Sequence, residues 1–167
     1  MKQIILLLLF IGLNLCNAQK SKLNVYVFVA EECPISINMT PALNQISARF
    51  INEANFNLVF PLENSTIASA EKFKNKYHLD NFKVILDKKQ KLTKLLHAEV
   101  TPEAIITNEN GKILYKGRIN DSYLDVGKRR HIYSNNDLLD ALKLLEGGND
   151  VPKPWKNAVG CLITLND

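Results

Sequence analysis

Cys33 stands between a segment typical of a strand and one typical of a helix. The apolar run from Leu23 to Ala30 predicts a buried strand, and the apolar spacing of three or four residues after Cys33 predicts a helix from Pro34 to about Asn52. Proline suits a first helical position because its missing N–H would have no partner there. A thiol at such a junction lies near the positive end of the helix dipole, which lowers its pKa. The alternative is a buried cysteine that merely ends the strand.

The first 18 residues have the pattern of a signal peptide. Lys2 gives a basic start, the apolar run from Ile4 to Leu13 is too short for a stable membrane anchor, and a cleavage site is predicted after Ala18. Cys16 offers an alternative, lipid attachment, although Leu15 before it fits such a site poorly. No later segment is long and apolar enough to cross a membrane. We therefore expect an exported protein, periplasmic or extracellular.

Removal of this segment leaves two cysteines, Cys33 and Cys161. Exported proteins work under oxidising conditions, so the two thiols raise the question of a disulfide, which the sequence alone leaves open. The net charge of +4 is modest. The basic residues form no stripe interleaved with aromatic residues, so we expect no nucleic-acid partner.

The order of the predicted elements defines an α/β fold. Strands alternate with helices and end in a hairpin around the turn 108–111, which predicts a mixed central sheet with helices on both faces. The predicted organisation is a signal peptide at 1–18, one domain at 19–148 and a tail at 149–167 that carries Cys161. The predicted strands are 23–30, 57–62, 83–86, 103–107 and 112–119, with a further one at 159–165; the predicted helices are 34–52, from 64–66 to 77, 89–97 and 137–145.

These features resemble the thioredoxin superfamily, in particular the redoxin branch of exported thioredoxin-like and peroxiredoxin-like proteins. The resemblance covers about residues 22–147. Cys33 lies at the strand-to-helix junction, Pro41 follows inside the helix as the kinking proline of thioredoxins does, and Thr101-Pro102 looks like the cis-proline loop. The resemblance implies a three-layer thioredoxin-like fold and thiol–disulfide chemistry without a cofactor, acting on protein thiols or disulfides as a monomer.

The site departs from the family pattern in two ways. Ser36 replaces the second cysteine of the Cys-x-x-Cys pair, so it can only donate a hydrogen bond to a Cys33 thiolate. Ala30 replaces the threonine that peroxiredoxins place before their reactive cysteine. Glu31 and Glu32 add negative charge and are expected to raise the pKa of Cys33. Peroxide reduction is therefore not expected.

The first functional hypothesis is a thiol–disulfide oxidoreductase. In it, Cys33 is the nucleophile and Ser36 assists it. Pro34, Thr101 and Pro102 contact an extended substrate strand. Cys161 is the resolving thiol, brought back to the site by the tail; the alternative is that Cys161 is an ordinary buried thiol on a final strand.

Two further hypotheses belong to other classes. Soft thiolates suit Cu(I), so a copper-handling protein could use Cys33, Cys161 and His131 as ligands, although the closely spaced cysteines of copper-handling relatives are absent and no metal ligand is assigned. The last hypothesis is a binding module without catalysis, in which the face around Pro102 meets a partner and Cys33 has no chemical role.

Overall fold

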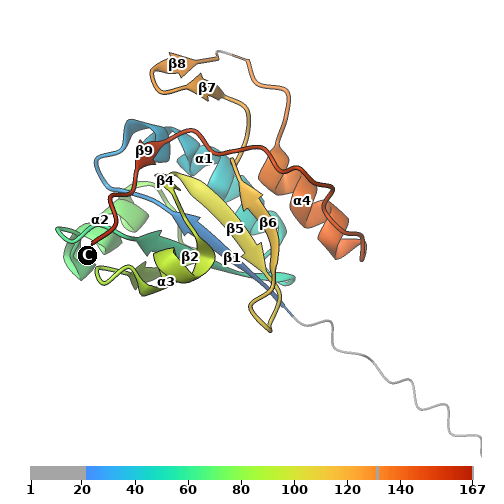
Figure 1. Cartoon of the computed structure of the whole chain (residues 1–167), viewed down its shortest axis with the longest axis horizontal. Helices are drawn as coiled ribbons and strands as arrows, with labels where there is room; N and C mark the ends of the chain where they lie inside the picture. Colours follow the sequence, from blue (N-terminus) through green and yellow to red (C-terminus); the bar gives the residue numbers. More distant parts are fainter. Residues whose placement is uncertain (1–21, 131, 167) are drawn as a thin grey trace, which may run out of the picture.

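A computed structural model describes residues 22–130 and 132–166. Within them, the central sheet holds five strands: β1 (Leu23–Phe28), β2 (Ala54–Phe60), β3 (Phe82–Leu86), β5 (Glu103–Thr107) and β6 (Ile113–Gly117). Their spatial order is β3-β2-β1-β5-β6. The first three strands run parallel, and β5 and β6 are antiparallel to their neighbours. The predicted mixed sheet is confirmed (Figure 1).

The helices described by the structure are α1 (Pro34–Arg49), α2 (Ile67–Lys76), α3 (Lys91–Leu96) and α4 (Asp137–Glu146). Helix α1 ends at Arg49, earlier than predicted, because the chain turns at Phe50 and its carbonyl accepts a hydrogen bond from the first residue of β2, Ala54. Helix α2 begins with a reciprocal cap, in which the Thr66 side chain accepts from the Ser69 amide and the Ser69 hydroxyl from the Thr66 amide.

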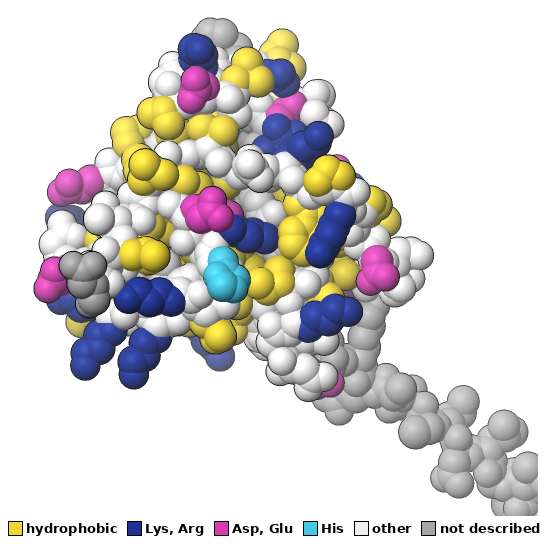
Figure 2. All heavy atoms as spheres, viewed as in Figure 1, with side chains coloured by type: hydrophobic (Ala, Val, Ile, Leu, Met, Phe, Trp, Pro, Cys, Tyr) yellow, Lys and Arg dark blue, Asp and Glu magenta, His cyan; other side chains and the backbone are white. Residues whose placement is uncertain are grey.

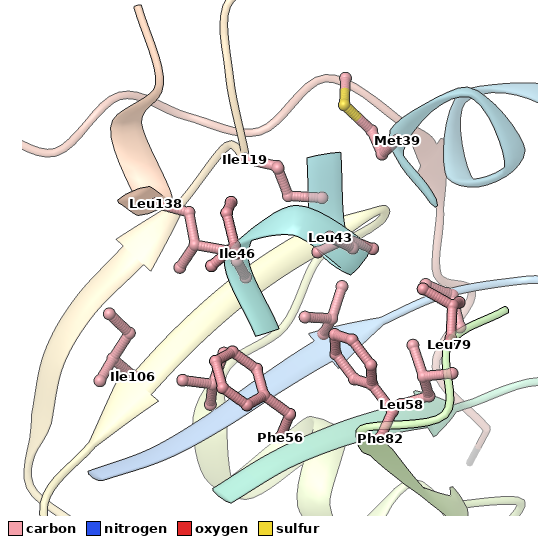
Figure 3. Packing of buried hydrophobic residues seen from close by; sticks show 14 of the residues in the cluster. Met39, Leu43, Ile46, Phe56, Leu58, Leu79, Phe82, Ile106, Ile119 and Leu138 are labelled. Atoms are coloured by element: carbon pink, nitrogen blue, oxygen red, sulfur yellow. The ribbon is translucent and has the colours of Figure 1, made fainter. Parts of the chain in front are cut away.

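The larger hydrophobic core lies on one face of the sheet. Leu43 and Ile46 of α1 face Phe56 and Leu58 of β2, and Leu138 of α4 packs beside Ile46 (Figure 3). Side chains alternate between the faces of a strand, so every second residue of β2 enters this core. The buried aliphatic and aromatic groups here supply most of the area that drives folding.

A second core covers the opposite face. Phe28 of β1, Val59 of β2 and Ile105 of β5 pack there with Leu96 of α3, and Ile163 from near the C-terminus joins them. Helices therefore cover both faces of the sheet, as the three-layer expectation requires.

The segment after residue 148 returns to the centre of the molecule. We call residues 149–166 the tail. The tail runs from the end of α4 across the top of the sheet to the side where α2 and α3 lie (Figure 1). On the way, β9 (Cys161–Leu162) pairs with β4 (Val100–Thr101) in antiparallel register. The strand at 159–165 is thus much shorter than predicted, because only two of its residues lie beside a partner strand.

Two predictions concern the membrane, one on spanning segments and one on the signal peptide. Among the described residues, no helix is long and apolar enough to cross a bilayer. The predicted signal peptide, 1–18, and Cys16 lie outside the described residues.

The connection between β6 and α4 contains a small hairpin, β7 (Tyr123–Asp125) and β8 (Lys128–Arg129). Asp121 lies buried at the start of this connection and binds it to the residues just before α4. Its carboxylate accepts hydrogen bonds from the backbone amides of Ser134 and Asn135 and from the Arg130 guanidinium. Burial alone raises the pKa of Asp121, but the hydrogen bonds from Asn135 and Ser134 and the charge of Arg130 outweigh it and lower the pKa to about 2.

Asp121→Asn is expected to lower the free energy of unfolding at pH 7 by about 2 kcal/mol, because a buried charge with several donors is replaced by a neutral amide. An unfolded aspartate has a pKa of about 3.9, so the contribution of Asp121 is full above about pH 4 and is lost as the pH falls toward 2. Urea unfolding as a function of pH measures both effects. The control Asp140→Asn removes an exposed carboxylate that pairs with Lys143 and should change little. Equal effects of the two substitutions on the free energy of unfolding would contradict this stabilising role of the Asp121 carboxylate.

Candidate functional site

The candidate site begins with Cys33, which lies between β1 and α1. Cys33 is the N-cap residue of α1 and has extended backbone geometry, with φ −76° and ψ 113°. Pro34 follows as the first helical residue and is exposed. The Cys33 carbonyl accepts the first helical hydrogen bond, from the Ile37 amide at 3.1 Å. The Cys33 side chain is therefore fixed at the positive end of a 16-residue helix.

The Thr101–Pro102 segment lies directly against this thiol. The peptide bond between the two residues is cis, and both residues are buried. The Cys33 thiol donates a hydrogen bond to the Thr101 carbonyl oxygen at 3.1 Å. Residues 68 positions apart in sequence thus meet at the sulfur atom.

The tail brings the second cysteine to the same place. The Cys161 and Cys33 sulfur atoms are 2.8 Å apart, although 128 positions separate them in sequence. The register of β4 and β9 sets Cys161 opposite Thr101, whose carbonyl also contacts Cys33. Both cysteines are free thiols here, and they differ in access: Cys33 is only 3% exposed, whereas Cys161 is an exposed residue.

Gly160 allows the tail to approach this closely. A Cβ atom at Gly160 would lie 2.2 Å from the Thr101 carbonyl oxygen, a distance that real Cβ atoms do not adopt. Gly117 of β6 allows a second close approach, to an earlier part of the tail. A Cβ atom at Gly117 would lie 2.2 Å from the Lys156 carbonyl oxygen. The neighbouring Arg118 amide donates to that carbonyl at 3.1 Å.

Further contacts hold the tail after Cys161. The Ile163 amide donates to the Glu99 carbonyl at 2.9 Å, and the Ile163 side chain is buried in the second core. The side chain of the buried Gln90 donates to the Thr164 carbonyl and accepts from the Asn166 amide, at 2.9 and 2.7 Å. Cys161 is therefore held from both sides.

The two thiols differ in acidity. Burial raises the pKa of Cys33, but hydrogen bonds from Cys161 and from the backbone and side chain of Ser36 outweigh it, so the pKa is lowered overall. The contact with the Thr101 carbonyl acts in the other direction, since only a protonated Cys33 can donate to it. Burial raises the pKa of Cys161 to about 11, together with its hydrogen bond to Cys33 and the negative charge of the Cys33 thiolate.

The expectation that Glu31 and Glu32 raise the pKa of Cys33 is wrong. The pKa is lowered, and neither carboxylate is among the main causes of the shift. The Glu31 carboxylate instead accepts hydrogen bonds from the Ser65 and Ser69 hydroxyls, at 2.8 and 2.7 Å. Glu32 is exposed to solvent.

The structure thus brings Cys33, Ser36, Thr101, Pro102 and Cys161 together, with Pro34 exposed beside them. The edge of β4, where an extended substrate strand was expected, is paired with β9 of the same chain. Sequence reasoning missed Gly160 and Gln90, although the Gly-Cys dipeptide could have suggested a close backbone approach.

For the copper hypothesis, the part of the chain that the structure describes contains no group of three or more His, Cys, Asp or Glu side chains able to hold a metal ion. His131, its third suggested ligand, lies outside the described residues.

Solved structures similar to this chain extend over most of its length. An uncharacterised conserved protein from Geobacillus kaustophilus is 21% identical, with a TM-score of 0.76 over 88% of this chain and 79% of that one. A hypothetical protein from Sinorhizobium meliloti 1021 is 19% identical, with a TM-score of 0.75 over 89% and 82%. A secreted disulfide oxidoreductase from Mycobacterium tuberculosis is 18% identical, with a TM-score of 0.52 over 74% and 82%. No family model and no curated protein matches the chain.

The fold is therefore the thioredoxin-like fold. The strand order, the helices on both faces and the similarity to solved members all agree with the resemblance seen in the sequence.

Ser36→Ala is expected to shift the pH dependence of Cys33 alkylation to higher pH, because the thiolate loses the hydrogen bond from the Ser36 hydroxyl. A hydrogen bond of about 1 kcal/mol corresponds to a roughly fivefold slower reaction at pH 7. Iodoacetamide labelling of reduced protein, read at Cys33 by peptide mass spectrometry, measures the rate. Ser47→Ala is the matched control, because Ser47 is a buried serine of α1 whose hydroxyl donates to Asn44. An unchanged profile for Ser36→Ala would contradict the role of this hydroxyl.

Gly160→Ala is expected to push β9 away from β4, because the new Cβ meets backbone atoms that cannot rotate aside. An overlap of this kind costs about 2 kcal/mol, so we expect disulfide formation between Cys33 and Cys161 by glutathione disulfide to slow by roughly thirtyfold. Gly147→Ala is the control, since Gly147 has φ −75° and its Cβ would meet the movable Asn149 side chain at 3.2 Å. Disulfide formation at the wild-type rate in Gly160→Ala would contradict the packing argument.

Proposed function

We propose that this protein is an exported thiol–disulfide oxidoreductase whose redox pair is Cys33 and Cys161. The observation that carries the proposal is the distance of 2.8 Å between the two sulfur atoms. The described residues contain no other cysteine, and the tail that holds Cys161 is fixed on both sides of it. Two cysteines that are held in contact although they lie 128 positions apart in sequence are suited to reversible disulfide formation.

The chemistry needs only the two thiols and a partner. In the oxidised protein, Cys33 and Cys161 share a disulfide. Two thiols of a partner protein reduce this bond in two exchange steps, each by attack of a thiolate on a sulfur atom, and the partner leaves with a disulfide of its own. Two electrons and two protons pass from the partner to the cysteine pair, and the reverse reaction returns them.

The surrounding residues tune this exchange. Ser36 stabilises the Cys33 thiolate through its amide and hydroxyl, and so makes Cys33 a better nucleophile at neutral pH and a better leaving group. Thr101 fixes the sulfur and the tail in one place, through its carbonyl and its pairing with Cys161. This arrangement replaces the missing second cysteine of a Cys-x-x-Cys pair with a cysteine that comes from the tail.

The remaining parts of the proposal concern the cellular setting. The signal peptide at 1–18 would deliver the domain at 19–148 and the tail at 149–167 to an oxidising compartment, where the protein acts as a monomer on protein thiols or disulfides. The similarity in fold to a secreted disulfide oxidoreductase supports this setting.

The test uses protein expressed from the full chain, purified without reductant and oxidised with glutathione disulfide. Mixed with a reduced two-cysteine peptide, it should gain two thiols while the peptide gains a disulfide, as measured by mass spectrometry. Cys33→Ala and Cys161→Ala should each slow peptide oxidation at least about a hundredfold, because neither variant can form the internal disulfide.

Circular dichroism of each alanine variant provides the control for folding. The proposal is wrong if either folded variant oxidises the peptide as fast as the wild type does, or if the wild-type protein forms no disulfide. Partner capture that survives alkylation of both thiols would instead favour a binding module.

A further inference from the structure

The two sulfur atoms of the site are not equally open to a partner. Cys33 is 3% exposed and lies between the Thr101 carbonyl and the Cys161 sulfur. Cys161 is exposed, and the next residue, Leu162, is 81% exposed. On the face crossed by the tail, hydrophobic side chains reach the surface among charged ones (Figure 2). A large partner can therefore reach Cys161 more readily than Cys33, which is covered.

Uncovering Cys33 would require the tail to leave. The Lys156 carbonyl is held by the Arg118 amide, the Ile163 amide by the Glu99 carbonyl, and Asn166 by Gln90. Ile163 would also have to leave the second core. These contacts lie on both sides of Cys161, so the tail is not a free arm that can swing away and back.

The acidities of the thiols agree with this difference in access. In thiol–disulfide exchange, the sulfur with the lower pKa leaves more readily. The pKa of Cys33 is lowered, and that of Cys161 is raised to about 11. When the disulfide is attacked at Cys161, the departing group is thus the better-stabilised thiolate.

We infer that partner thiols attack the sulfur of Cys161, while Cys33 stays buried as the leaving group, when the oxidised site accepts electrons from protein dithiols. This inference rests on the proposed function and assigns which of the two sulfur atoms the partner attacks. It reverses the expected roles, in which Cys33 met the substrate and Cys161 resolved the intermediate.

The reaction has two steps. First, a partner thiolate bonds to the Cys161 sulfur, the Cys33–Cys161 bond breaks, and its electron pair leaves on Cys33 as a thiolate. Second, the other partner thiolate attacks the partner's own sulfur in this mixed disulfide, and Cys161 leaves and takes up a proton. The partner is oxidised to a disulfide and the cysteine pair is reduced by two electrons. The substrate class is thus a protein with two neighbouring thiols.

The test stops the reaction after its first step. Oxidised full-chain protein is mixed with excess reduced glutathione, a monothiol, then quenched in acid, alkylated and digested for peptide mass spectrometry. At least about nine in ten of the glutathione adducts should be on Cys161, with Cys33 recovered as the free, alkylated thiol. A majority of adducts on Cys33 would overturn this inference and leave the proposed function standing. Absence of both the disulfide and the adduct would overturn the two together.

A matched pair of variants gives a second measurement. Of the two cysteines of the site, Cys33→Ser leaves the exposed one, and Cys161→Ser leaves the buried one beneath an intact tail; labelling is read at each peptide by mass spectrometry. A maleimide carrying a large polyethylene glycol chain should label Cys161 in the first variant at least about tenfold faster than Cys33 in the second, while iodoacetamide, a small reagent, labels both. Equal labelling by the large reagent would show that Cys33 is open to partners, which overturns the inference.

Discussion

The pairing of β9 with β4 is the interaction on which the site depends. It sets Cys161 opposite Thr101, and Thr101 also contacts Cys33, so one two-residue ladder fixes three groups at once. The ladder exists because Gly160 lets two backbones approach more closely than a side chain allows. Without it, Cys33 would be a single cysteine at the end of a helix, with no second sulfur to exchange with.

The central fold could be predicted from the sequence because its signals are local. Alternating strands and helices, the Asn-Gly turn and the proline after Cys33 each report on a few neighbouring residues. The central sheet, its hairpin and the helices follow from these signals, with errors at element ends such as that of α1, whereas the small hairpin of β7 and β8 was not predicted. Asp121 was missed because its donors lie up to 14 positions away in an irregular segment.

The site could be predicted only in part, because its geometry is not local. Cys33, Ser36, Thr101 and Cys161 were named from the sequence, but their meeting depends on a ladder of two residues that no periodic pattern reveals. The effect of Glu31 on the pKa of Cys33 could not be predicted correctly for the same reason. Its carboxylate is bound by Ser65 and Ser69, more than thirty positions away. The path of the tail also decides which of the two thiols is covered, and the amino-acid composition does not reveal that path.

The distance along the chain between the two cysteines has a consequence for biogenesis. A polypeptide is made from its N-terminus onward, and Cys33 precedes Cys161 by 128 positions. During that interval the tail does not yet cover the N-terminus of α1, and the Cys33 thiol there is open to glutathione or to other cysteines nearby. Contacts that join such distant segments also form late in folding. Newly made molecules therefore pass through a stage in which Cys33 is vulnerable to wrong pairing, and the arrival of β9 ends it.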